Sequence, residues 1–97
     1  MGEHKVYILK SGEYFKIGIT GGDVIKRIKG LQTGNPIKIE LFGLYPCKDK
    51  KHAFSLETAI HLYFKKYRTN GGKEWFSLTE EQIKGFLKYF DFSMYKK

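Results

Sequence analysis

The sequence predicts an α+β fold in the order strand-strand-helix-strand-helix, followed by a short extended piece and a C-terminal helix. Two strand-like segments, 6–9 and 16–20, stand on either side of a Ser-Gly pair and indicate a hairpin. Three later segments carry apolar residues at helical spacing, whereas 37–45 alternates apolar and polar residues like a strand. Because no linker, repeat or low-complexity segment interrupts this pattern, we expect residues 1–97 to form a single domain.

The hairpin register gives the first indication of a site. Ser11-Gly12 is typical of a tight turn, and a two-residue connection there would place Tyr7 opposite Lys16. One face would then be apolar, and the other would carry Tyr7, Leu9, Tyr14, Lys16 and Gly18. A phenol and an amine side by side could form part of a site that acts on a phosphodiester. The same pattern also fits an ordinary half-buried hairpin, in which Tyr7 is a strand former and Lys16 a solvated charge.

The first helix and the third strand follow the hairpin. Gly21-Gly22-Asp23 predicts a turn and an N-cap, and the helix ends near Gly34-Asn35-Pro36. Its apolar stripe consists of Val24, Ile25, Ile28 and Leu31. The strand at 37–45 is closed by the lysine-rich run 48–51, which we expect to be a solvated loop.

A longer helix is predicted from about His52 to Tyr67, ended by the turn at 69–72. Its apolar stripe consists of Ala53, Leu56, Ile60, Tyr63, Phe64 and Tyr67. Residues 74–76 indicate a short extended piece, in which Trp75 and Phe76 are expected to be core residues that seal the end of a helix, with base stacking as the alternative. Thr79-Glu80-Glu81-Gln82 has the capping-box pattern that opens a last helix.

Composition favours nucleic acid as the partner. Lys and Arg number 18 against 10 Asp and Glu, a net charge of +8, which attracts a polyanion; alternatively, the lysines only keep the domain dispersed. No apolar run approaches the roughly 20 residues of a membrane span. The single Cys47 excludes an internal disulfide and a multi-cysteine zinc site, so we expect a reducing, cytoplasmic location.

Two polar residues lie at the rims of helical stripes. Arg27 flanks the first stripe, and Glu57 borders that of the long helix. Mg²⁺ is commonly held by one or two carboxylates together with water and substrate phosphate, so one glutamate can be enough. The alternative is that Glu57 is a surface charge paired with His61 at i,i+4.

These residues resemble the GIY-YIG nuclease superfamily, specifically its small branch typified by phage T5 and by large DNA viruses. Tyr7 corresponds to the tyrosine of the first signature, where Lys5 and Val6 replace Gly and Ile. Lys16-Ile17-Gly18 corresponds to the second signature, with lysine in place of tyrosine, a departure that this branch shares. Arg27 matches the helix arginine and Glu57 the single metal-binding glutamate.

The resemblance covers nearly the whole chain. Further matches are Leu56-Glu57 followed by His61 and Phe64, and later Arg68 and Glu74-Trp75-Phe76. Asn70 is the nearest counterpart of a late asparagine, and Leu31 stands where some members have histidine.

The resemblance implies a small central three-stranded antiparallel sheet flanked by helices, and DNA hydrolysis that depends on Mg²⁺ or Mn²⁺. In that mechanism Glu57 binds the metal, Arg27 contacts the scissile phosphate, and Tyr7 relays a proton or acts as general base. Lys16 tunes Tyr7 or contacts phosphate, and His61 contacts DNA or protonates the leaving oxygen. The expected nucleic-acid contacts are Lys16, Lys26, Arg27 and Arg68.

Three alternatives belong to other classes of function. The chain could be a catalytically inactive nucleic-acid-binding module with the same fold, or an interaction domain whose basic surface is incidental. It could also be a metal-free phosphodiesterase with Tyr7 as covalent nucleophile. We expect DNA as partner, with RNA as the alternative, no membrane, and a monomer or weak homodimer.

Overall fold

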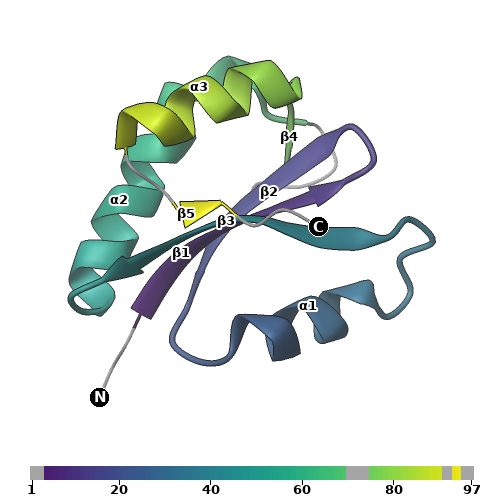
Figure 1. The fold of residues 1–97 in the computed structure, drawn as a ribbon, viewed down its shortest axis with the longest axis horizontal. Coiled ribbons are helices and arrows are strands. Elements are labelled where there is room, and N and C mark those ends of the chain that lie inside the picture. Colours follow the sequence, from purple (N-terminus) through teal and green to yellow (C-terminus); the bar gives the residue numbers. More distant parts are fainter. Residues whose placement is uncertain (1–3, 70–74, 91–92, 95–97) are drawn as a thin grey trace.

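The computed structural model describes residues 4–69, 75–90 and 93–94, and its centre is an antiparallel sheet in the order β4-β2-β1-β3-β5. Helix α1 covers one face, and α2 and α3 cover the other (Figure 1). The elements are β1 (His4–Ser11), β2 (Tyr14–Thr20), α1 (Val24–Gln32), β3 (Ile39–Cys47), α2 (Lys50–Tyr63), the 3₁₀ turn η1 (Lys65–Tyr67), β4 (Trp75–Ser77), α3 (Glu80–Phe90) and β5 (Ser93–Met94). The α+β class and the antiparallel three-strand centre are confirmed, with β4 and the unpredicted β5 added at the edges.

The predicted hairpin register is wrong by two residues. Tyr7 pairs with Gly18, and Lys16 pairs with Leu9. The loop is Gly12-Glu13, because Gly12 adopts φ +63°, and a left-handed first loop residue suits the two-residue turns that match strand twist. Since a shift of two preserves side-chain alternation, Tyr7 and Lys16 still share one face, as predicted.

The N-cap of α1 is confirmed, because the Asp23 carboxylate accepts the Ile25 N–H at 2.9 Å. Strand β3 begins at Ile39, two residues later than predicted. The side chain of Gln32 accepts the Ile39 N–H at 2.8 Å and donates to the Ile37 carbonyl at 3.0 Å. These bonds hold residue 37 in the turn after α1.

The lysine-rich run 48–51 is not a loop throughout, because α2 begins at Lys50. Asp49 is its N-cap and accepts the His52 N–H at 2.8 Å. The helix ends at Tyr63, four residues before the predicted end, and η1 follows. Tyr63 is 66% exposed, so it does not belong to the buried stripe. Residues 70–72 of the predicted turn lie outside the described residues.

The sheet separates two apolar clusters. The cluster under α1 is small and is formed by Tyr7, Leu9, Val24 and Ile39. The larger cluster lies between the sheet, α2 and α3, and includes Ile8, Ile17, Ile60, Phe64, Phe76, Ile83 and Leu87. The predicted capping box of α3 is confirmed, because Thr79 and Gln82 exchange hydrogen bonds at 2.9 and 3.1 Å. The candidate residues Tyr7 and Lys16 therefore lie on the thinly covered face.

Candidate active site

Tyr7 is positioned by the glycine opposite it. The ring is fully buried and crosses onto β2, so that a Cβ atom at position 18 would stand 2.6 Å from the Tyr7 Oη. Real Cβ atoms essentially never approach other atoms so closely. Gly18 therefore leaves the space in which the phenol hydroxyl lies.

Arg27 reaches this hydroxyl from α1. Its Nε donates to the Tyr7 Oη at 3.4 Å, which joins the helix to the sheet across twenty residues of sequence. Val24 is buried under the helix, and Ile28 and Leu31 pack against the same cluster, so Arg27 is held at the border of the apolar stripe. Arg27 and its neighbour Lys26 are both exposed. A phosphate can therefore approach the guanidinium from solvent.

Lys16 lies on the same face, one row of the sheet away from Tyr7. Its direct partners are Leu9 on β1 and Trp75 on β4. The ammonium stands 5.5 Å from the centroid of the Trp75 ring, within cation–π range, and the residue is only 8% exposed. Lys16 thus places a largely desolvated positive charge beside the Tyr7 and Arg27 pair.

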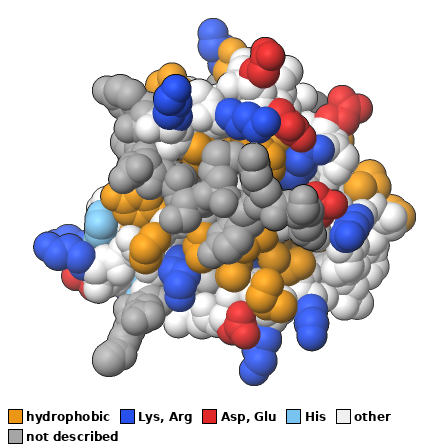
Figure 2. Space-filling view, viewed as in Figure 1, with side chains coloured by type: hydrophobic (Ala, Val, Ile, Leu, Met, Phe, Trp, Pro, Cys, Tyr) orange, Lys and Arg blue, Asp and Glu red, His pale blue; other side chains and the backbone are white. Residues whose placement is uncertain are grey.

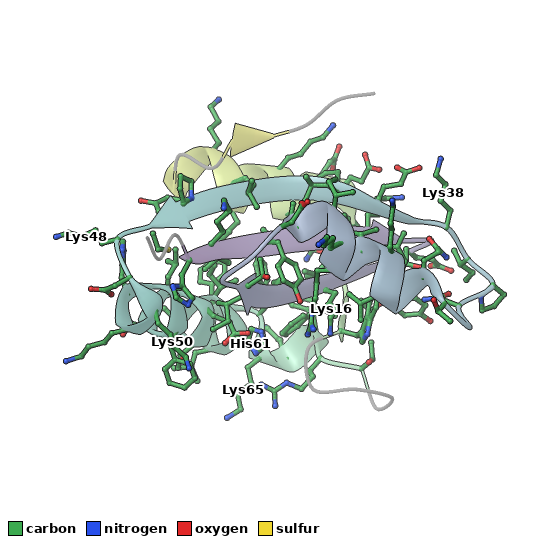
Figure 3. The ribbon with its side chains drawn as sticks, turned by 90° about the horizontal axis from the view of Figure 1, so that it is seen from below. Lys16, Lys38, Lys48, Lys50, His61 and Lys65 are labelled. Atoms are coloured by element: carbon green, nitrogen blue, oxygen red, sulfur yellow. The ribbon has the colours of Figure 1, made fainter. Side chains whose placement is uncertain are left out.

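Glu57 and His61 come from α2, on the opposite side of the sheet. Among the residues that the structure describes, β4 pairs with β2 at residues 14–16, and the carbonyl oxygen of the next residue, Ile17, lies 2.8 Å from His61 Nε2. The Glu57 carboxylate lies 3.9 Å from the same nitrogen. The Glu57 and His61 side chains are 12% and 16% exposed. Figure 3 shows Lys16, His61 and Lys65 in the lower part of the view, on the β2 side of the sheet.

The Tyr7–Arg27 pair and the Glu57–His61 pair thus contact neighbouring residues of β2 from opposite sides of the sheet. Tyr7 lies over Gly18, and His61 bonds the backbone of the adjacent residue. Arg68 is exposed and bridges Phe76, on the outer side of β4. Asn70 and Glu74 lie outside the described residues.

The protein donors near the site match an oxygen-binding cation. Among residues 4–69, 75–90 and 93–94, no three His, Cys, Asp or Glu side chains come together as a metal cage. Glu57 is the carboxylate at the β2 edge, beside a histidine whose Nε2 is engaged by a carbonyl. One carboxylate fits Mg²⁺ or Mn²⁺, which take further ligands from water and phosphate.

The surface around the site is basic. Lys65, Lys66 and Arg68 are exposed near the end of α2. Figure 2 shows lysine and arginine side chains scattered over another face of the molecule, with acidic side chains among them, so positive charge is not confined to the surroundings of the site. In the described part of the chain, no helix has the length and apolarity needed to cross a membrane.

Three features were not predicted from the sequence. These are the position of Tyr7 over Gly18, the bond of His61 to a sheet carbonyl, and the placement of Trp75. Phe76 is fully buried in the large core, as expected, but Trp75 is only partly buried and lies on the Lys16 face. Strand alternation within 75–77 could have shown that the two aromatic residues point to opposite faces.

Comparison with known proteins identifies the family. No curated protein and no solved structure matches the chain significantly. The family model of the T5orf172 domain matches residues 4–91, a span that includes the candidate residues from Tyr7 to Arg68. That match confirms the resemblance to the small, phage-type GIY-YIG branch. The chain belongs to the T5orf172 domain family.

Proposed function

We propose that this chain is a divalent-metal-dependent DNA endonuclease. The family match supports a nuclease-like, DNA-binding module. The observation that carries the finer proposal is the Arg27 to Tyr7 hydrogen bond over Gly18, next to the edge where α2 presents Glu57. This arrangement combines a phosphate-binding cation, a hydroxyl and a carboxylate.

Arg27 and Lys16 bind and polarise the phosphate in this proposal. A guanidinium can donate two parallel hydrogen bonds to phosphate oxygens and so fix the orientation of the scissile group. Lys16 adds a second positive charge, which stabilises the negative charge that grows on these oxygens during attack. Its low exposure strengthens that interaction, because the charge is less screened than on the open surface.

Tyr7 holds or moves a proton at its Oη. The hydroxyl accepts from Arg27 Nε and belongs to a fully buried residue. In this proposal Arg27 turns toward the phosphate, and the Tyr7 hydroxyl then exchanges a proton with the attacking nucleophile.

Glu57 is the residue that would hold Mg²⁺ or Mn²⁺. Such a cation, when bound, stabilises charge on phosphate oxygens and makes water a better nucleophile. His61 lies beside Glu57 on α2, and its hydrogen bond to the Ile17 carbonyl anchors the helix to the sheet. Because a carbonyl can only accept, the Nε2 of His61 must be the donor. In this proposal His61 positions Glu57 relative to the sheet.

The test is nicking of supercoiled DNA with Mg²⁺ or Mn²⁺. We expect nicking by the wild type and its loss in Glu57→Gln, Arg27→Ala and Tyr7→Phe. Glu81→Gln is the matched control, because it removes an exposed carboxylate from the first turn of α3. Nicking that survives Glu57→Gln would overturn the metal-dependent mechanism. Metal-independent DNA binding without nicking in the wild type would identify an inactive binding module instead.

A further inference from the structure

Trp75 lies on the face of the candidate site. It pairs directly with Lys16, which pairs in turn with Leu9, so these three side chains form one row across β4, β2 and β1. Gly18 and the Tyr7 paired with it form the next row on the same face, roughly 7 Å along the strands. The indole is therefore a neighbour of the proposed phosphate site and is separated by the sheet from the main core.

The surroundings of Trp75 differ from those of a core aromatic residue. Phe76 is fully buried, whereas Trp75 is partly exposed on a three-residue edge strand. The Lys16 ammonium lies 5.5 Å from the ring centroid, so the indole is held beside a positive charge. A flat, partly exposed aromatic ring next to a cation is a combination with which proteins bind unpaired nucleotides, through base stacking and phosphate attraction together.

We propose that Trp75 stacks on an unpaired nucleobase adjacent to the phosphate held by Arg27 and Lys16. This inference rests on the proposed function. It gives the substrate class as DNA with a single-stranded or locally opened segment at the site, because the bases of an intact duplex already stack on both faces. Lys16 then has two roles, since it orders the indole and neutralises the neighbouring phosphate.

The single tryptophan makes this proposal directly measurable, because all indole emission comes from residue 75. A labelled single-stranded oligonucleotide is titrated with wild-type protein in chelator, which prevents metal-dependent cleavage, and anisotropy and indole emission are recorded together. We expect emission to be quenched along the same binding curve as the anisotropy. A hairpin duplex of the same length should quench less at equal saturation.

Variants separate stacking from simple burial. Trp75→Leu should weaken single-strand binding about tenfold, and Trp75→Phe should restore most of the affinity, because a smaller ring still stacks. Tyr63→Leu is the control, since it removes an exposed aromatic side chain from α2, on the other side of the sheet. Thermal melting of each variant identifies any loss of folding, and Trp75→Phe keeps the test valid if Trp75→Leu does not fold.

Two results would overturn the proposal: emission that stays constant while the protein saturates with DNA, or a Trp75→Leu variant that binds as tightly as the wild type. Equal quenching by the duplex would overturn the assignment to unpaired bases. If DNA quenches the indole emission but the protein does not nick plasmid DNA, the stacking proposal would hold and the nuclease proposal would fail. Absence of any binding would overturn both.

Discussion

The Tyr7 ring lies across Gly18 on the neighbouring strand, with its hydroxyl oxygen 2.6 Å from the point where a Cβ of residue 18 would be. The glycine of the second family signature thus makes room for the tyrosine of the first. The two signatures are one packing unit, in which the strand register brings the phenol within reach of Arg27.

Gly18→Ala should displace Tyr7 and destabilise the domain. The ring is fully buried, so overpacking should cost about 1–3 kcal/mol. For a domain of this size, each kcal/mol lowers the melting temperature by about 4–8 °C. Gly85→Ala is the control, because nothing lies within 4 Å of a Cβ there and the residue sits inside α3. That variant should melt a few degrees above the wild type, because alanine favours a helix interior by about 1 kcal/mol over glycine. A Gly18→Ala protein with unchanged melting and nicking would contradict the observed packing.

Arg27→Lys should lower nicking about 100-fold although the charge is kept, because a lysine cannot hold Tyr7 and a phosphate through one planar group. Lys29→Arg makes the reverse exchange at an exposed position of the same helix and should leave the rate unchanged. Rates are compared at saturating DNA, so that weaker binding does not enter. Equal rates for Arg27→Lys and the wild type would rule out a specific role for the guanidinium.

His61→Gln should keep most of the activity, because the glutamine amide can still donate toward the Ile17 carbonyl. The loss should be smaller than the roughly 100-fold expected for removal of a general acid, and the pH–rate profile should keep its shape. His61→Ala should lower the free energy of unfolding by about 1–3 kcal/mol, because it removes the donor to that carbonyl. If His61→Gln abolished one limb of the profile, His61 would be a proton donor instead of a positioning residue.

Cys47 should react slowly with thiol reagents at neutral pH. Burial raises the pKa of its thiol, the nearby Asp49 carboxylate raises it further, and a hydrogen bond from the Val6 backbone partly opposes them. Because the pKa of the thiol is raised in the folded state, the stability that this shift contributes to the fold is present below the unfolded pKa and is lost as pH rises through the folded value. Because the thiolate is the form that reacts, reaction with a disulfide reagent should accelerate toward alkaline pH.

Asp49→Asn is the informative variant for Cys47, because asparagine still caps α2 while the negative charge is removed. Its thiol should react faster than the wild-type thiol at the same pH, and urea unfolding should show an intact fold. A reaction rate equal to that of an unstructured cysteine peptide at neutral pH would refute the raised pKa.

The sequence predicts the faces of the hairpin but not its register. Alternation of apolar residues assigns Tyr7 and Lys16 to one face in any register shifted by an even number of residues. The direct pairing depends instead on which residue takes the left-handed position, and both Ser11-Gly12 and Gly12-Glu13 contain Gly12. The pairing is decided by whether Gly12 is the first or the second residue of the loop, and the alternation of apolar residues does not encode that choice.

The spacing of apolar residues does not predict contacts between the helices and the sheet. Helical spacing places Glu57 and His61 at the border of the apolar stripe, but it does not predict which strand that border faces. The contact of His61 with Ile17 depends on how α2 packs against the sheet through Ile60 and Phe64. Likewise, α2 was predicted too long at its end because Phe64 and Tyr67 continue the apolar spacing into η1.

The bond of His61 to the Ile17 carbonyl limits how this fold can be altered. Because that carbonyl belongs to the β2 backbone, a change that shifts β2 at residue 17 should also shift α2, and Glu57 should move with the helix. The position of the carboxylate is therefore set in part by the path of a strand, so a designer could adjust it without changing any charged residue.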